Sequence, residues 1–149
     1  MQYRKHQMSH LLSGIKVLIV EDEEMLRDLL SDEFKFHGAV TKTANDGRAA
    51  LELIKKESFD FVISDIRMPG GDGIELLRQT RKLPKAPLVF MCSGVSDLSR
   101  EGLLKEGASD VFEKPFDLEK LVSAIAAQLK KPKASKPKGS KVSKKKSKN

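Results

Sequence analysis

The sequence is poor in cysteine and aromatic residues, and it contains no long apolar run. A single cysteine, Cys92, excludes an internal disulfide and a metal site built from several thiolates. Because Cys92 lies within an apolar segment, we interpret it as a small core residue rather than a nucleophile. No apolar stretch approaches the length of a membrane span, and the polar first thirteen residues lack the apolar region of a secretory signal. These absences predict a soluble, cytoplasmic protein without a transmembrane segment.

The length of 149 residues and the apolar share of 39% suit one domain with short terminal segments. We expect a flexible extension over residues 1–13, a folded domain over 14–131 and a disordered tail over 132–149. Met8 is an alternative start, which would make residues 1–7 an upstream extension, and the sequence leaves both starts open. No second domain is expected after the folded one.

Acidic residues are missing from the last twenty positions, which contain ten lysines. Without these ten lysines, 18 basic residues face 21 acidic ones, so residues 1–129 carry a net charge of about −3. The segment is rich in lysine, serine and proline and too poor in apolar residues to fold. It is either a solvated tail or an electrostatic arm for nucleic acid, anionic lipid or an acidic partner. Lacking aromatic residues and an apolar face, such an arm would bind in a sequence-independent, salt-sensitive way.

Strand-like and helix-like segments alternate between residues 15 and 129. Short apolar segments predict strands at 16–20, 39–43, 61–65, 88–92 and 110–113. Helical spacing of apolar residues predicts helices at 22–38, after residue 46, around 74–81, at 97–106 and at 118–129. Five such units in series predict an α/β fold with a doubly wound parallel sheet and helices on both faces. Right-handed crossovers then bring the carboxyl ends of all five strands to one rim, where such sheets place their functional crevice.

Polar residues stand at the expected strand ends on this rim, namely Glu21, Asp22, Asp65, Ser93 and Lys114. Three carboxylates at one rim would repel each other unless a cation lies between them. Mg²⁺ suits such a place because it binds through one or two carboxylates, keeps several waters and accepts phosphate oxygens. A hydroxyl and an ammonium group suit the remaining oxygens of a phosphoryl group. The set predicts a phosphoryl-transfer site in which an Asp carboxylate is the nucleophile.

The blocks "VLIVEDEE", "FDFVISDIRMPGGDGIELL", "CSG" and "GASDVFEKPF", in this order and spacing, resemble the receiver domain of two-component response regulators. The resemblance covers roughly residues 15–129, about four-fifths of the chain. It implies a stand-alone receiver with a flavodoxin-like fold and strand order 2-1-3-4-5. It also implies a phosphoacceptor rather than an enzyme, although self-catalysed phosphorylation and dephosphorylation are possible within the family. The phosphoryl donor would be a histidine kinase or a phosphotransfer protein, and phosphorylation would change the surface that binds partners.

Position by position, the resemblance makes Asp65 the phosphoacceptor. Asp22 would bind Mg²⁺ directly and Glu21 through a water molecule, and the backbone carbonyl of Arg67 would complete the metal site. The resemblance gives Ser93 the hydroxyl that moves onto the phosphoryl group.

Lys114 corresponds to the family lysine that is paired with this hydroxyl residue, and the Lys114–Pro115 bond resembles one that is cis in the family. Val111 stands where the family often has an aromatic residue, and Phe112 should face the opposite side of its strand. We therefore expect the loop after Ser93 and the next helix to move, rather than an aromatic side chain.

Other polar residues receive structural interpretations. We interpret Asp72 as a turn or helix-cap residue and Asp110 as a turn residue. The three histidines, His6, His10 and His37, are scattered and are interpreted as surface residues rather than ligands.

Two other functions remain as alternatives. In the first, the receiver fold is a phosphorylation-independent binding module that the lysine-rich tail delivers to DNA or an anionic membrane. The second is a metal-dependent phosphatase with an Asp nucleophile. It is less favoured because such enzymes commonly carry a second Asp two residues later, where this chain has Arg67. The cognate kinase, the downstream partner, the signal and the oligomeric state do not follow from the sequence.

Overall fold

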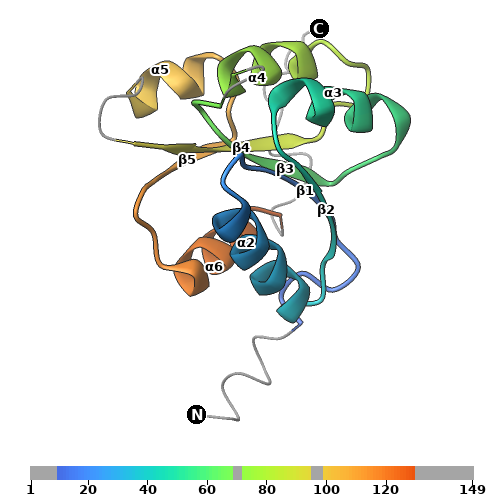
Figure 1. Cartoon of the computed structure of the whole chain (residues 1–149), viewed down its shortest axis with the longest axis vertical. Helices are drawn as coiled ribbons and strands as arrows, with labels where there is room; N and C mark the ends of the chain where they lie inside the picture. Colours follow the sequence, from blue (N-terminus) through green and yellow to red (C-terminus); the bar gives the residue numbers. More distant parts are fainter. Residues whose placement is uncertain (1–9, 69–71, 95–98, 130–149) are drawn as a thin grey trace, which may run out of the picture.

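The computed structural model describes residues 10–68, 72–94 and 99–129. Strands and helices alternate along these residues, as predicted, and Figure 1 shows one sheet between two layers of helices. The elements are β1 (Lys16–Val20), α2 (Glu24–Phe36), β2 (Val40–Ala44), α3 (Gly47–Lys56), β3 (Phe61–Asp65), α4 (Gly73–Arg81), β4 (Leu88–Ser93), α5 (Arg100–Lys105), β5 (Asp110–Glu113) and α6 (Leu118–Leu129). Among these described helices, none has the length and apolar character needed to cross a membrane.

The sheet is parallel throughout and has the order β2-β1-β3-β4-β5, which confirms the predicted α/β fold and strand order. Helices α2 and α6 cover one face, and α3, α4 and α5 cover the other (Figure 1). In the register of the sheet, Val20 lies beside Ser64, and Asp65 lies beside Cys92. The carboxyl ends of the strands therefore form one rim, and their amino ends form the opposite rim.

Each face of the sheet has its own apolar core because side chains alternate along the strands. Val17 and Ile19 pack on the α2/α6 side, whereas Leu18 packs on the other side. Val111 and Phe112 also belong to opposite sides, as predicted from strand periodicity. Cys92 is buried, as expected for a core residue, and burial raises the pKa of its thiol. The strands are thus held from both faces, which keeps their ends in fixed positions.

Several element ends differ from the predicted ones by a few residues. Strand β2 is shifted by one residue, β4 includes Ser93, and α2 spans Glu24–Phe36 rather than 22–38. Within the described residues, α5 covers Arg100–Lys105 and is shorter than the predicted 97–106 helix; positions 97 and 98 lie outside the described residues. Its start is set by Ser99, whose hydroxyl accepts a hydrogen bond from the Gly102 N–H at 3.1 Å.

The folded unit begins before residue 14, so the prediction of a flexible extension through residue 13 is wrong at its end. Leu12 is fully buried, and its N–H donates to the His37 carbonyl at 2.8 Å. The interpretation of His37 as a surface residue is also wrong, because its side chain is only 1% exposed and lies 3.2 Å from Glu33. His10 is exposed, and position 6 lies outside the described residues. The N-terminal turn thus covers the end of α2, a contact that local sequence does not encode.

Two acidic residues have structural roles. Asp72 caps α4 as predicted, since its carboxylate accepts a hydrogen bond from the Glu75 N–H at 2.9 Å. The turn interpretation of Asp110 is wrong. This residue begins β5, accepts a hydrogen bond from Gln128 at 2.5 Å and forms an ion pair with Arg100 at 2.6 Å. Its partners come from distant chain positions, so only the folded structure reveals them.

Candidate functional site

Three carboxylates meet at the rim formed by the carboxyl ends of the strands. Glu21 and Asp22 directly follow β1, and Asp65 is the last residue of β3. Because β1 and β3 are neighbours, oxygen atoms from all three side chains lie within 4.8 Å of one another. Glu21 is buried, Asp65 is largely buried and Asp22 is exposed, so the cluster opens to solvent on one side. The structure thus brings together the three acids expected to share a site.

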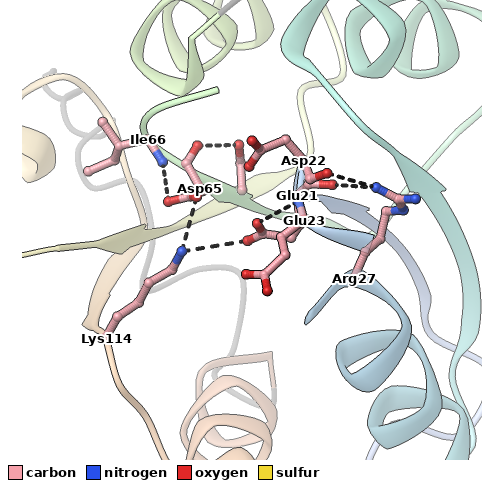
Figure 2. Close-up of polar contacts among 8 residues, drawn as sticks. Glu21, Asp22, Glu23, Arg27, Asp65, Ile66 and Lys114 are labelled. Carbon is pink, nitrogen blue, oxygen red and sulfur yellow. Dashed lines mark hydrogen bonds and ion pairs between the residues drawn. The ribbon is translucent and has the colours of Figure 1, made fainter. Parts of the chain in front are cut away.

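The predicted lysine reaches this cluster from the end of β5. The Lys114 Nζ lies 3.0 Å from Asp65 Oδ2 and 3.6 Å from Glu21 Oε1. Figure 2 marks both contacts with dashed lines. Its backbone N–H donates to the Ser93 carbonyl at 2.9 Å, and the Lys114–Pro115 bond is cis, as expected. Lys114 therefore contacts both buried carboxylates.

Burial and charge act against each other in this cluster. Burial raises the pKa of Glu21 above its ordinary value, and the hydrogen bond from the Glu23 N–H and the Lys114 charge oppose this rise only partly. For Lys114, burial disfavours the ammonium, but its hydrogen bond to Asp65 and the neighbouring negative charges raise its pKa overall. The Glu21 shift thus comes mainly from burial, whereas the Lys114 shift comes from its contact with the acids.

Two further predicted residues, Ser93 and Arg67, come from segments next to the cluster, the first from the end of β4 and the second from the chain just after Asp65. Ser93 ends β4 and is only 6% exposed, between the strands that carry Asp65 and Lys114. Arg67 follows Asp65 by two residues and has an exposed side chain. Their predicted roles, a hydroxyl for the phosphoryl group and a carbonyl for the metal, stay predictions.

Residues that orient the acids were missed by the sequence reasoning. The Ile66 N–H donates to Asp65 Oδ1 at 2.9 Å, so the Asp65 carboxylate is held on one oxygen by backbone and on the other by lysine. Arg27 Nη1 donates to the Glu21 carbonyl at 2.9 Å (Figure 2). The Ile66 donor could not be predicted from residue types, because every residue except proline has a backbone N–H. Arg27 was visible only as one charge in a helix that begins beside the acids.

Gly73 was also missed, although it stands in the quoted "GGDG" loop. It lies so close to the Asp65 carbonyl that a Cβ at this position would overlap it, and its N–H donates to the Ile66 carbonyl at 2.7 Å. The start of α4 therefore packs directly on the backbone of the Asp65 segment. The signal in the sequence was a glycine at the start of a helix, where other residues are usually preferred.

The donor set suits a hard divalent cation. Carboxylate oxygens are the ligands that Mg²⁺ prefers, and one or two of them are sufficient when water and phosphate oxygens complete the shell. Asp22, the exposed acid of the cluster, is accessible to water and other ligands from solvent. The described residues thus form an acidic cluster that can hold a cation beside Asp65.

Comparison with known families agrees with this geometry. The family model described as the response regulator receiver domain matches residues 17–126. An uncharacterized transcriptional regulatory protein of Bacillus subtilis, YrkP, is 40% identical over 116 residues, which are 77% of this chain. The aligned part is 49% of YrkP, so this chain spans about half the length of that relative.

Solved structures show the same likeness. The receiver domain of the Francisella response regulator 1452 has a TM-score of 0.72 and 31% identity, with 78% of this chain and 96% of that chain covered. The chemotaxis response regulator CheY4 of Vibrio cholerae has a TM-score of 0.69 and 30% identity, with 78% and 99% covered.

Proposed function

This chain belongs to the family of response regulator receiver domains of two-component systems, and from this premise we propose that Asp65 is its phosphoacceptor. The observation that supports the proposal is the position of Asp65 at the strand rim, within an acidic cluster that could hold a cation and 3.0 Å from the Lys114 Nζ. The donor would be a histidine kinase or a phosphotransfer protein. The consequence would be a change in the surface that binds partners.

The proposed step is an in-line transfer from a phosphohistidine. An oxygen of the Asp65 carboxylate forms a bond to phosphorus while the bond between phosphorus and the donor imidazole nitrogen breaks. The bonding electron pair stays on that nitrogen, which regains its proton from solvent, and an aspartyl phosphate remains on this chain. Lys114, now paired with Asp65, is positioned to hold a phosphoryl oxygen, and the Ser93 hydroxyl is proposed to hold another.

We propose Mg²⁺ as the cation of this site. Asp22 and Asp65 would bind it directly, Glu21 would bind it through water, and the Arg67 carbonyl would complete the set. When bound, it supplies positive charge that offsets the charge of phosphoryl oxygens. The three acids contribute the ligand oxygens, and their shared negative charge attracts the ion.

An exposed apolar stripe on α2 supports a protein as phosphoryl donor. Met25, Leu29 and Phe36 are 74%, 54% and 49% exposed, although large apolar side chains are usually covered. Their spacing of four and seven residues places them on one side of the helix. Because α2 begins two residues after Asp22, the stripe starts beside the acidic cluster. A donor protein that covers it would bring its phosphohistidine to the same rim as Asp65.

Helix α5 is the proposed responding element. The Arg100 guanidinium, at the start of α5, donates to the Val111 carbonyl at 2.9 Å and pairs with Asp110 at 2.6 Å. These bonds join α5 to β5, the strand that precedes Lys114. A shift of Lys114 toward a phosphoryl group would therefore act on α5 through Arg100 and change the populations of two surface arrangements.

Incubation with Mg²⁺ and a small acyl-phosphate donor tests the phosphoacceptor. Intact-mass spectrometry should show one added phosphoryl group on the wild type and on Asp32→Asn, an exposed control on α2. Asp65→Asn should remain unlabelled. Absence of labelling in the wild type, or equal labelling of Asp65→Asn, would contradict the proposal.

A second candidate function is binding of a polyanion through the lysine-rich tail. The specific observation is the charge distribution, with ten lysines and no acid in residues 130–149 against a net charge of about −3 elsewhere. Deleting residues 132–149 should remove a salt-dependent interaction with an oligonucleotide or anionic vesicles. Unchanged binding after truncation would rule out the tail as the binding element.

A further inference from the structure

A groove of about 390 Å³ lies at the rim opposite Asp65. One side is formed by the end of α3 and the segment before β3, and the other by the loop between α4 and β4. The strands begin at this rim, since β3 starts at Phe61 and β4 starts at Leu88. The groove is therefore separate from the acidic cluster, which lies at the strand ends.

The groove has lysines on both sides and an apolar floor. Lys55 and Lys56 stand on the α3 side and Lys85 stands on the loop side, all three exposed. Phe59 and Pro87 line the groove and are buried. The lysine stems and the edges of these apolar residues offer a surface for sugar groups, while the ammonium groups suit phosphates on either side.

These lysines are not neutralised within the described part of the chain. No ion pair there joins Lys55, Lys56 or Lys85 to an acid. The one acid that lines the groove, Glu57, is already bound by Lys16 at 2.7 Å and by another lysine at 3.2 Å, Lys42. Its hydrogen bonds to these two lysines lower the pKa of Glu57, so it stays charged and paired. The groove therefore carries net positive charge.

The lysine-rich segment starts from the same rim. Gln128, in the last turn of α6, donates a hydrogen bond to Asp110, the first residue of β5. This bond places the end of α6 at the amino ends of the strands, where the groove lies. The chain continues from Leu129 directly into residues 130–149 with their ten lysines. The groove lysines and the last described residue before the lysine-rich segment thus lie at one rim, while the three carboxylates lie at the other.

We infer that this groove binds a single-stranded nucleic acid, with phosphates of its backbone held by the lysines on the two sides. This inference deepens the polyanion candidate above and does not depend on phosphorylation of Asp65. A strand fits a concave groove with lysines on both sides, whereas a planar bilayer cannot enter it. The exposed large apolar side chains of the described residues, which a membrane contact would use, lie outside the groove. Because Phe59 is buried, base stacking is not available, and binding is independent of sequence.

Fluorescence anisotropy with a labelled oligothymidylate tests the groove in the full-length chain. The variant Lys55→Gln/Lys56→Gln/Lys85→Gln should bind about tenfold more weakly than wild type at low salt, because three phosphate contacts are lost. The salt slope of log Kd should also become shallower by about two. The control Lys35→Gln/Arg48→Gln/Lys120→Gln removes the same charge from exposed positions outside the groove, and its binding should fall much less.

Further measurements separate the two polyanion ideas and the phosphoacceptor. Truncation after residue 131 should weaken binding, and the groove substitutions should weaken it further in the truncated chain. Asp65→Asn should bind the oligothymidylate as tightly as wild type. A negative result for nucleic-acid binding therefore does not bear on the phosphoacceptor proposal, and the reverse also holds. Equal binding by the groove and control variants would overturn the inference, even if truncation abolished binding. Displacement by phosphatidylserine vesicles or duplex DNA at lower concentration than by single strands would overturn it as well.

Discussion

Gly73, the first residue of α4, packs against the backbone carbonyl of Asp65 so closely that no side chain fits between them. The contact joins the helix to the segment that carries the proposed phosphoacceptor, and the Gly73 N–H also donates to the Ile66 carbonyl. Ile66 in turn donates its own N–H to Asp65 Oδ1. A side chain added at Gly73 should therefore shift the position of the Asp65 carboxylate.

Gly73→Ala is the first prediction. The added Cβ must displace backbone rather than a flexible side chain, so we expect a loss of about 1–3 kcal/mol in the free energy of unfolding, measured by urea titration. Labelling of Asp65 by a small acyl phosphate should also slow. Gly14→Ala is the control, because Gly14 has a φ of 77° but open space around it. That variant should lose stability through backbone strain and keep the labelling rate. Equal labelling rates in both variants would argue against a positioning role for Gly73.

Mg²⁺ should stabilise the folded chain because the ligand oxygens converge only in the folded state. At about ten times its Kd, the ion should add about 1.4 kcal/mol to the free energy of unfolding. Asp22→Asn removes a proposed direct ligand and should abolish most of this gain, whereas Asp32→Asn should keep it. Thermal unfolding with and without Mg²⁺, at constant ionic strength, measures the difference. A gain of equal size in Asp22→Asn would place the ion elsewhere.

The pH dependence of stability should reveal the buried Glu21. Its pKa is raised above 4.5 in the folded state, so the folded chain holds this proton more tightly than the unfolded chain. Stability therefore falls as the pH rises from about 4.5 through the raised pKa, and the full cost is present at pH values above it. Without Mg²⁺, Glu21→Gln should be more stable than wild type at neutral pH, and the difference should shrink in acid.

Urea unfolding at several pH values checks this result, with Glu52→Gln, which makes the same substitution at an exposed position outside the acidic cluster, as the control. If Glu21→Gln were instead less stable at neutral pH, the attraction between Glu21 and Lys114 would outweigh the cost of burial.

The apolar stripe on α2 should matter for protein donors and not for small ones. Leu29→Asp places a charge in the middle of the stripe and should slow phosphoryl transfer from a histidine kinase or phosphotransfer protein by about tenfold, which corresponds to about 1.4 kcal/mol. Labelling by a small acyl phosphate should not change, because Leu29 is 54% exposed and outside the acidic cluster. Lys35→Gln, on another side of α2, should leave both rates unchanged. A parallel loss with the small donor would indicate a folding defect rather than a docking defect.

The elements of this fold could be predicted because each is encoded locally. Short β-branched runs such as 16–20 can be buried on both faces only as central strands, and caps such as Asp72 and Gly107 mark helix ends through their own backbone preferences. The exact first and last residues of the helices and strands were harder to predict than the elements themselves. In the described structure α5 begins at Arg100 and Ser99 is its cap, because the Ser99 hydroxyl accepts a hydrogen bond from the Gly102 N–H.

The meeting of the site residues at one rim could also be predicted from the sequence. Parallel strands carry their last residues to one rim, so Glu21, Asp22, Asp65, Ser93 and Lys114 had to approach each other once the topology was known. Their family resemblance then named a role for each. The orientation of the acids could not be predicted from the sequence, because it depends on backbone groups. The Ile66 N–H donates to the Asp65 carboxylate, and the Arg27 guanidinium donates to the Glu21 carbonyl.

The strands, the helices, the acidic ends of β1 and β3 and the difference in charge between residues 1–129 and 130–149 can all be read from the amino-acid sequence. Each of these depends on neighbouring residues or on periodicity. Three other features depend on the packed structure: Leu12 and His37 are buried together, Asp110 joins α5 and α6 to β5, and the lysine groove lies at the same rim as the end of α6. These contacts join residues far apart in the chain, and their energies depend on distances that exist only after the sheet and its helices have packed.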